Sequence, residues 1–343
     1  MRKSATPKKR KLSTAKIQYT GQIPHIYGIW LLNIILSIMT LGIYSFWGRV
    51  RLRKYVASRV VLAGDPCQYT GTGGELFLGF IKGILFLFLS YVLLTIGYAI
   101  IYFIAAFFAH FSGEAQADAI MAGASLVSGA LFVVFYYALF CVAIFSALRY
   151  RFSRVTWRGI RGAIKYSAFT YACQSIKFTI LKILSLGLYA HIADVKLAKM
   201  VAENSYYGNA RAKFHGNPES LWKINFITML LSIPTLALSR LWYKAALIRH
   251  NFQATQIDHL RFDFDITGGK LLGFYLVNLL IVVCTLGIGM PYVMQRSIKL
   301  VADNLTIIGD INTSKVLQSN EELAGSGEGL NSVIGEPDFA GVI

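Results

Sequence analysis

Charged side chains are scarce in this sequence. Asp, Glu, Lys and Arg make up 15% of the 343 residues, whereas hydrophobic residues make up 55%. A soluble domain usually carries about 25% charged residues, because its surface must be hydrated. This scarcity argues against an ordinary soluble protein. The remaining soluble alternative, a large protein with fully buried helices, is disfavoured because six buried helices of the length found below rarely occur in one chain.

Acidic residues are scarcer still, with 17 Asp and Glu against 34 Lys and Arg, a net charge of +17. A basic excess is compatible with nucleic-acid binding, and Lys8–Lys11 resembles a nuclear signal. However, basic residues beside apolar segments are also retained on the cytoplasmic side of membranes, where they attract anionic lipid. We therefore predict the lipid bilayer and anionic lipid head groups as partners, and no nucleic acid. The sequence specifies neither a protein partner nor a homo-oligomer.

Spacings typical of metal or cofactor sites are missing. The four cysteines are far apart without a CxxC pair, and the histidines show no HExxH spacing. The densest group of metal-ligand types is Asp258, His259, Asp263 and Asp265. Alternation places Asp263 and Asp265 on one strand face with Arg261, which favours a solvated face over a metal site. We therefore predict no metal, no cofactor and no enzyme activity, although a catalytic triad assembled from distant positions stays open.

Long apolar segments are what the sequence has in abundance. Each contains about 20 residues or more, enough to cross a hydrocarbon core of ~30 Å at a rise of ~1.5 Å per residue. They are Ile23–Trp47, Leu76–His110, Ile120–Leu148, Ala168–Ile192, Leu221–Trp242 and Leu271–Met294. These segments predict an all-α integral membrane protein, a multi-pass helical bundle.

Short sequence matches recur along the chain. Thr40–Tyr44 matches Ser185–Tyr189 at an offset of 145 residues and Thr285–Ile288 at an offset of 245, and Trp47 matches Trp242 at 195. Several matches in one register predict internal repeats of about 50 residues. Each repeat is expected to contain an apolar helix, a basic stretch and a short strand-like segment. The strand-like segments are Cys67–Thr70, Arg154–Trp157, Arg211–Phe214 and Leu260–Ile266, for which we predict a small sheet at one membrane face.

Helix-breaking residues occur at matching positions of these repeats. Gly42, Gly187 and Gly287 end their apolar segments, and Pro234 interrupts the fifth. Two topologies follow. Six single spans fit the segment lengths, but they leave 16 basic residues outside and 14 inside, against the positive-inside rule. If instead only the second and third segments cross and the others turn back at their breaks, these basic residues all lie inside. Both topologies place the two termini in the cytoplasm.

Polar residues inside apolar segments are candidate pore or helix-contact residues. They are Asn33, Lys177, Lys182, Thr228 and Asn278. Unpaired polar groups are unfavourable in lipid, so these side chains either line a path or bond to another helix. Both lysines lie in the fourth apolar segment, where a lysine also extends to the interface.

Three regions are expected along the chain. Residues 1–20 are predicted to be a basic, disordered cytoplasmic tail, and residues 21–310 a multi-pass membrane domain. Residues 311–343 contain Gly, Ser and acidic residues with little apolar content, which predicts a flexible cytoplasmic tail.

Particular strings resemble a known family. Tyr44–Tyr55, Tyr69–Gly73 and Gly327–Leu330 are similar to the bacterial inner-membrane family typified by YjgN, a domain family of unknown function. The resemblance extends over about Gln22 to Phe339. It implies a multi-pass protein of the bacterial inner membrane and brings no activity and no functional residues.

Two functions remain after these exclusions. Broken membrane helices are typical of transporters, so we predict a transporter or channel-like protein for a small solute or ion. The alternative is a non-transporting membrane scaffold, or a protein that binds lipid or a partner through its basic stretches. The scarcity of acidic residues inside the apolar segments favours this alternative.

Overall fold

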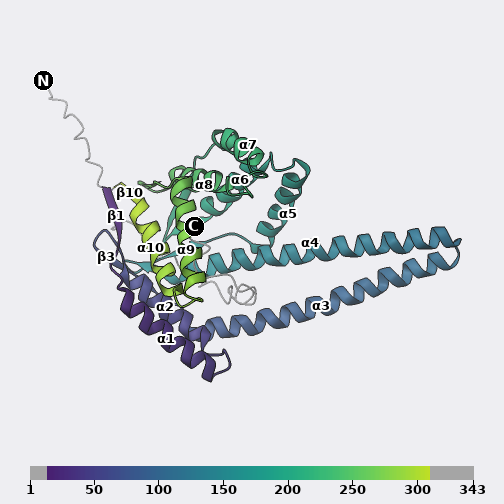
Figure 1. Cartoon of the computed structure of the whole chain (residues 1–343), viewed down its shortest axis with the longest axis horizontal. Helices are drawn as coiled ribbons and strands as arrows, with labels where there is room; N and C mark the ends of the chain where they lie inside the picture. Colours follow the sequence, from purple (N-terminus) through teal and green to yellow (C-terminus); the bar gives the residue numbers. More distant parts are fainter. Residues whose placement is uncertain (1–13, 310–343) are drawn as a thin grey trace.

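The computed structural model describes residues 14–309. Within this range the order strand–helix–helix–strand occurs five times, with the strands on one side and the helical hairpins extending away from them (Figure 1). The five segments are β1 (Thr14–Tyr19), α1 (Ile23–Met39), α2 (Ser45–Arg59) and β2 (Val60–Leu62); β3 (Asp65–Tyr69), α3 (Gly73–His110), α4 (Glu114–Arg154) and β4 (Val155–Trp157); β5 (Ile160–Ile164), α5 (Ala168–Leu184), α6 (Ala190–Glu203) and β6 (Ser205–Tyr207); β7 (Ala210–Phe214), the 3-10 turn η1 (Pro218–Leu221), α7 (Trp222–Leu230), α8 (Arg240–Ala254) and β8 (Thr255–Ile257); and β9 (Leu260–Phe264), α9 (Gly268–Cys284), α10 (Met290–Asn304) and β10 (Leu305–Ile308).

The strands of the described residues form one closed, ten-stranded antiparallel barrel. Strands β1 and β10, from opposite ends of this range, pair with Thr14 opposite Ile308 and close the ring. Successive segments are joined by two-residue hairpin turns. In the turn between β2 and β3, Ala63 and Gly64 have φ of 50° and 89°, as a turn that matches the twist of its strands requires. Closure pairs every strand on both sides and removes the exposed edges of an open sheet.

The barrel shows that the predicted all-α helical bundle is wrong. Each strand-like segment found in the sequence overlaps a strand, but together with the remaining strands they form a closed barrel and not a small sheet. Residues 14–19, which the sequence analysis placed in the basic tail, form β1 of this barrel. The strands are three to six residues long, and β1 pairs with a strand almost 300 residues away, so local patterns did not indicate closure.

The multi-pass bundle is also contradicted, and of the two topologies that the sequence left open, the one with six single spans does not fit the described residues. Among them, two helices are long and apolar enough to cross a membrane: α3 with 38 residues and α4 with 41. Helices α1 and α9 are apolar but have 17 residues each. The α3–α4 hairpin extends far beyond the rest of the molecule (Figure 1).

The other apolar segments turn back on themselves. Gly42, Gly187 and Gly287 lie between the two helices of their hairpins with φ of 90°, 91° and 88°. In the apolar segment Leu221–Trp242 the turn follows Pro234, and Leu236 and Ala237 adopt φ of 48° and 64°. Because a positive φ suits glycine but not most other residues, these positions fix where each helix reverses.

Each hairpin packs against the next where it meets the barrel. Phe46, Val50, Tyr69, Leu76 and Tyr150 form one buried cluster, which joins α2, α3, α4 and β3. A matching cluster with Phe264, Ile266 and Leu271 joins the last hairpin to the barrel.

A partly buried polar contact fixes the base of the α3–α4 hairpin. The Tyr150 hydroxyl donates to Glu75 Oε2 at 2.6 Å, and Arg154 Nη2 lies 3.2 Å from the same oxygen. Glu75 lies in the first turn of α3, where the Thr72 hydroxyl accepts the Glu75 N–H. A carboxylate here interacts favourably with the start of the helix. The contact joins the beginning of α3 to the end of α4.

Candidate functional site

The principal candidate site is a pocket beside the barrel, between α2, α4 and α10. Its volume is about 310 Å³, at the lower end of the range for small-molecule sites. It is lined by Ile17, Arg53, Val56, Ala57, Val60, Cys67, Tyr69, Arg151, Val155, Ser297, Ile298, Val301 and Ala302. These residues come from three of the five segments, so the pocket exists only because the barrel closes β1 against β10.

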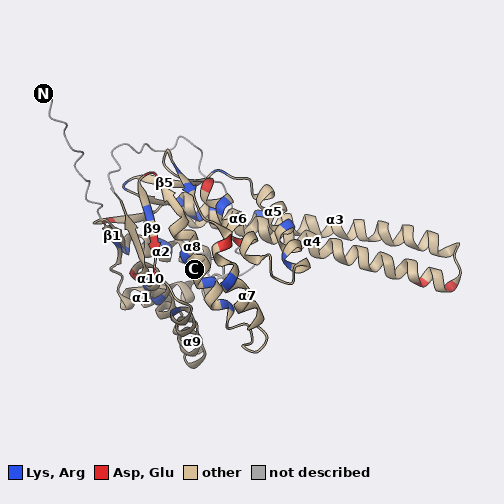
Figure 2. Ribbon diagram, turned by 90° about the horizontal axis from the view of Figure 1, so that it is seen from above, with Lys and Arg blue, Asp and Glu red and all other residues tan. Residues whose placement is uncertain are grey.

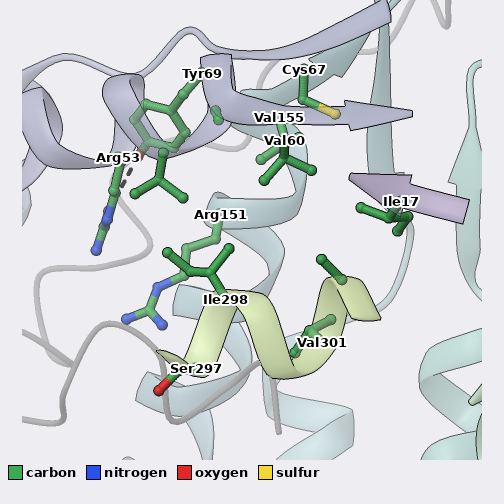
Figure 3. Close-up of a pocket in the computed structure, with 13 residues that line it drawn as sticks. Ile17, Arg53, Val60, Cys67, Tyr69, Arg151, Val155, Ser297, Ile298 and Val301 are labelled. Carbon is green, nitrogen blue, oxygen red and sulfur yellow. Dashed lines mark hydrogen bonds between the residues drawn. The ribbon is translucent and has the colours of Figure 1, made fainter. Parts of the chain in front are cut away.

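The pocket has a charged side and an apolar side. Figure 3 shows the guanidinium groups of Arg53 and Arg151 on the same side, with Ser297 nearby, and Ile17 and Cys67 on the other. Arg53 Nη1 donates to the Tyr69 hydroxyl at 3.1 Å, and its guanidinium carbon lies 5.8 Å from the centre of the Tyr69 ring. Tyr69 thus holds the Arg53 side chain in place.

In the other hairpins, the second helix carries no charge at the positions equivalent to Arg53 and Arg151. Arg53 lies seven residues before the first residue of β2. At the same distance before β4, β6, β8 and β10, the other segments have Leu148, Ala198, Ile248 and Ile298. Arg151 is four residues before its strand, where the others have Val56, Val201, Asn251 and Val301. The two arginines therefore depart from the apolar residues that these positions otherwise tend to have.

A second cavity, of about 260 Å³, provides an internal comparison. It lies among α4, α6 and α8 and is lined by apolar and uncharged polar side chains, including Phe152, Ala202, Asn251 and Phe252. Cavities thus form in more than one place where the second helices of different hairpins pack against the barrel. The charged side distinguishes the pocket between α2, α4 and α10.

Cys67 is a native thiol in the lining of this pocket. Burial raises the pKa of Cys67 above its ordinary value of 9.0. Because the thiolate is the reactive form, the thiol is expected to react more slowly at neutral pH than an exposed cysteine. It is well placed to report on whether the pocket is occupied.

A second polar group lies between the third and fourth hairpins. Lys182 and Asp194 form an ion pair, and the Tyr243 hydroxyl donates to the other oxygen of Asp194 at 2.7 Å. Burial, with the Asp194 charge beside it, raises the pKa of Tyr243 above its ordinary value. This group joins α5, α6 and α8.

Asn225 and Arg240 continue the polar contacts. Asn225 is 1% exposed, and its Nδ2 donates to the carbonyls of Gly187 and Leu188, both at 3.2 Å. Arg240 Nη1 donates to Asn225 Oδ1 at 3.0 Å. The carbonyls at the turn of the third hairpin are thus bonded by a side chain of the fourth, which holds the two hairpins together.

The polar residues predicted from the sequence lie in four different hairpins. Asn33 Nδ2 donates across its hairpin to the Gly48 carbonyl at 3.0 Å, whereas Thr228 donates to Ile224 within its own helix at 2.7 Å. Asn278 is buried in α9, and Lys177 is exposed on α5. Lys182 is bonded to Asp194. These residues belong to α1, α5, α7 and α9, four helices in four different hairpins.

Sequence reasoning missed the four residues that the structure brings forward: Arg53, Arg151, Asn225 and Arg240. The signal for Arg53 and Arg151 was present, because aligning the segments on the strand after each second helix makes these two residues stand out. The second helices had been interpreted as uniformly basic stretches, which concealed the difference. In the described range no group of three or more His, Cys, Asp and Glu is arranged to hold a metal ion.

A strand barrel that carries helical hairpins, one of them long and apolar enough to cross a bilayer, is consistent with a membrane protein. The model of a family described as bacterial proteins of unknown function (DUF898) matches residues 14–239 and 224–333. The chain belongs to this family, which confirms the family resemblance drawn from the sequence.

A curated relative adds a location. The chain is 35% identical over 74 residues to the "Inner membrane protein YjgN" of Salmonella typhimurium. The match covers 22% of this chain and 18% of the relative, so it spans less than a fifth of the relative's length. No solved structure matches this chain.

Proposed function

We propose that this chain is an inner-membrane protein that binds the lipid of one leaflet through its short hairpins and does not carry solute across the bilayer. The observation behind this proposal is the exposure of the hairpin tips. Leu41, Leu186, Leu236 and Leu286 are 95%, 84%, 88% and 92% exposed. Each lies at the turn of its hairpin and presents an apolar side chain that water would solvate poorly.

The depth that a tip reaches is limited by the position of the next basic residue along the chain. Leu41 is followed by Arg49 after eight residues, and Leu186 by Lys196 after ten. At ~1.5 Å per residue these distances are about 12 and 15 Å, no more than half of a hydrocarbon core of ~30 Å. A short hairpin therefore enters one leaflet while its basic second helix stays at the head groups, where it meets anionic lipid.

Orientation follows from the charges. Basic residues gather around the barrel and the bases of the hairpins, whereas the outer half of α3–α4 has few charges and acidic residues at its end (Figure 2). The positive-inside rule then puts the barrel in the cytoplasm and residues 111–113 outside. Because β1 and β10 pair in the barrel, both ends of the described range lie on the cytoplasmic side.

A transporter or channel, the other function that the sequence predicts, needs a polar path across both leaflets. The residues proposed for such a path lie in separate hairpins and bond mainly within them or to a neighbouring hairpin. This distribution supports a lipid-binding scaffold over a transporter. The proposal assigns the protein no catalytic activity.

Leaflet-specific quenching tests the proposal. Leu286→Cys and Leu126→Cys carry a fluorophore on the tip of the last hairpin and near the outer end of α4; both leucines are exposed, at 92% and 76%. Quenching lipids confined to the barrel-side leaflet should quench the first label more strongly, and quenching lipids in the opposite leaflet should quench the second. Equal quenching of the first label from both leaflets contradicts insertion into one leaflet.

Flux measurements test the absence of transport. Proteoliposomes with entrapped pH-sensitive and potassium-sensitive dyes should show the same leak with and without the protein. A protein-dependent flux that is saturable, and is lost on Lys182→Met, would instead support the transporter.

A further inference from the structure

We propose that the cavity among α4, α6 and α8 binds a small, flat, uncharged molecule that carries a hydrogen-bond donor, of the indole or phenol class. The volume of this cavity is about 260 Å³. For comparison, an engineered cavity of about 150 Å³ in a protein core binds benzene. A ligand of one or two rings therefore fits, and its binding does not depend on the lipid contacts proposed for the hairpins.

The space in this cavity arises from one alanine. Three residues before the strand that follows each second helix, the five segments have Ala57, Phe152, Ala202, Phe252 and Ala302. Phe152, Ala202 and Phe252 all line the cavity. Strand β6, which follows Ala202, lies between β4 and β8 in the barrel, so the alanine leaves room between two phenylalanines. A third phenylalanine at this position would fill the cavity.

The aromatic walls of the cavity are held in place by neighbouring residues. A Cβ added at Gly162 of β5 would lie 2.6 Å from the Phe152 ring, so this ring lies directly against the strand backbone. The Phe252 ring is stacked on Phe264, with 5.0 Å between the ring centres. Phe262 of β9 adds a third ring to the lining. These rings favour an aromatic ligand, because contacts between rings add to the gain from buried apolar area.

One polar side chain in the lining has an acceptor without a partner. The Oδ1 atom of Asn251 is buried and has no hydrogen-bond partner within residues 14–309. A buried acceptor without a donor is unfavourable, and the amide can turn about χ2 to present it to the cavity without breaking a hydrogen bond at that atom. At the equivalent positions the other segments have Val56, Arg151, Val201 and Val301, so the amide departs from the valine of three segments.

The two hydroxyls in the lining also offer acceptors. Ser205 Oγ donates to the Val201 carbonyl at 2.8 Å, and Thr255 Oγ1 donates to the Asn251 carbonyl at 2.7 Å. The hydroxyl hydrogens are therefore used, whereas lone pairs remain. This lining favours a ligand that donates a hydrogen bond, as an indole N–H or a phenol O–H does. The described residues that line the cavity are all uncharged, which favours an uncharged ligand.

Fluorine NMR of a monofluorinated indole tests the inference. The probe is added to the full chain in detergent, and its broadening by protein-free micles of the same detergent is subtracted. The protein should add saturable broadening, which unlabelled indole and phenol should reverse. Benzofuran has the size and shape of indole but no N–H. Its apparent dissociation constant, measured by competition, should be about fivefold higher or more, as expected for one missing hydrogen bond.

Substitutions taken from the other segments serve as variants. Ala202→Phe introduces the residue that α4 and α8 have at the equivalent position and should abolish the saturable broadening. Ala57→Phe makes the same change at an equivalent position outside this cavity, so it should leave binding of the probe unchanged. Asn251→Val introduces the residue of three other segments and should bring the dissociation constants of indole and benzofuran together.

Three results would overturn the inference. The first is an absence of saturable broadening by the parent chain beyond that of micelles, and the second is equal binding of indole and benzofuran by the parent. The third is equal binding of the probe by Ala202→Phe and the parent. If Ala202→Phe does not fold, Asn251→Val decides, because an unchanged preference for indole over benzofuran in that variant excludes the amide from the site.

Discussion

Gly73 and Gly74 are the first two residues of α3. Substitution by alanine is expected to lower the free energy of unfolding at Gly73 and to raise it at Gly74. A Cβ added at Gly73 would lie 2.6 Å from two ring carbons of Trp47 and 2.9 Å from the Trp47 Cα. A side chain can rotate, but the Cα belongs to the backbone of α2, so α2 and α3 must move apart. A Cβ added at the neighbouring Gly74 meets nothing within 4 Å.

The magnitudes follow from this difference. Overpacking of a tight contact destabilises by about 1–3 kcal/mol, which is the cost expected for Gly73→Ala. Gly74→Ala removes backbone freedom from the unfolded chain without a clash and should stabilise by about 0.4–1 kcal/mol. The pair differs by one position in one helix turn, so each variant is the control for the other.

Denaturant unfolding in a fixed detergent, followed by tryptophan fluorescence, measures both free energies. Trp47 lies at the contact itself, so its emission should also shift in Gly73→Ala. A Cβ added at Gly268 would lie 2.4 Å from the Trp242 ring, so Gly268→Ala should also lower the free energy of unfolding. Equal stabilities of Gly73→Ala and Gly74→Ala would refute the close approach of α2 and α3.

Three further outcomes are expected. Gly42→Val should lower the unfolding free energy by about 1–3 kcal/mol, because the φ of Gly42 is 90°. Gly28→Ala should raise it by about 0.5–1 kcal/mol, because Gly28 lies inside α1 and an added Cβ meets nothing within 4 Å. Chemical denaturation measures both changes. Asp194→Asn should destabilise by about 1–3 kcal/mol, since Lys182 loses its partner, and Tyr243→Phe by less; both are read by the same denaturation. Burial lowers the pKa of His250, so the unfolded chain takes up the proton first, and stability should fall as pH drops below about 6.5; His250→Gln should flatten this pH profile.

Part of the fold could be predicted from the sequence. Gly42, Gly187 and Gly287 were identified as helix breaks, and they do lie at turns with positive φ. The strand character of Leu260–Ile266 was visible because its alternation is long enough to register.

Closure of the barrel could not be predicted in the same way. Strand β2 has three residues, too few for a period of two to show, and its partners are β1 and β3. The pairing of Thr14 with Ile308 depends on the arrangement of the whole chain. Apolar content also misled the span count, because the residues that let a helix cross a bilayer also let a hairpin enter one leaflet.

The candidate site was harder to predict than the fold. Arg53 lies in the run Arg49–Tyr55, where every basic residue had been interpreted as a lipid contact. Its departure from the apolar residues at equivalent positions shows when the segments are aligned, whereas its contact with Tyr69 is visible only in the structure. The search for polar residues inside apolar segments also passed over Asn225, although it lies in the segment Leu221–Trp242.

The central claim is that, within residues 14–309, the α3–α4 hairpin alone crosses the bilayer. It is tested most directly by a membrane-impermeant thiol reagent applied outside cells that carry Ser112→Cys or Ser58→Cys in a background without the native cysteines. Ser112 lies between α3 and α4, and Ser58 lies near the end of α2. The account predicts that the cysteine at 112 is labelled in intact cells and that the cysteine at 58 is labelled only after the cells are permeabilised. Labelling at position 58 in intact cells, as strong as that at 112, would contradict it and restore a chain of single spans.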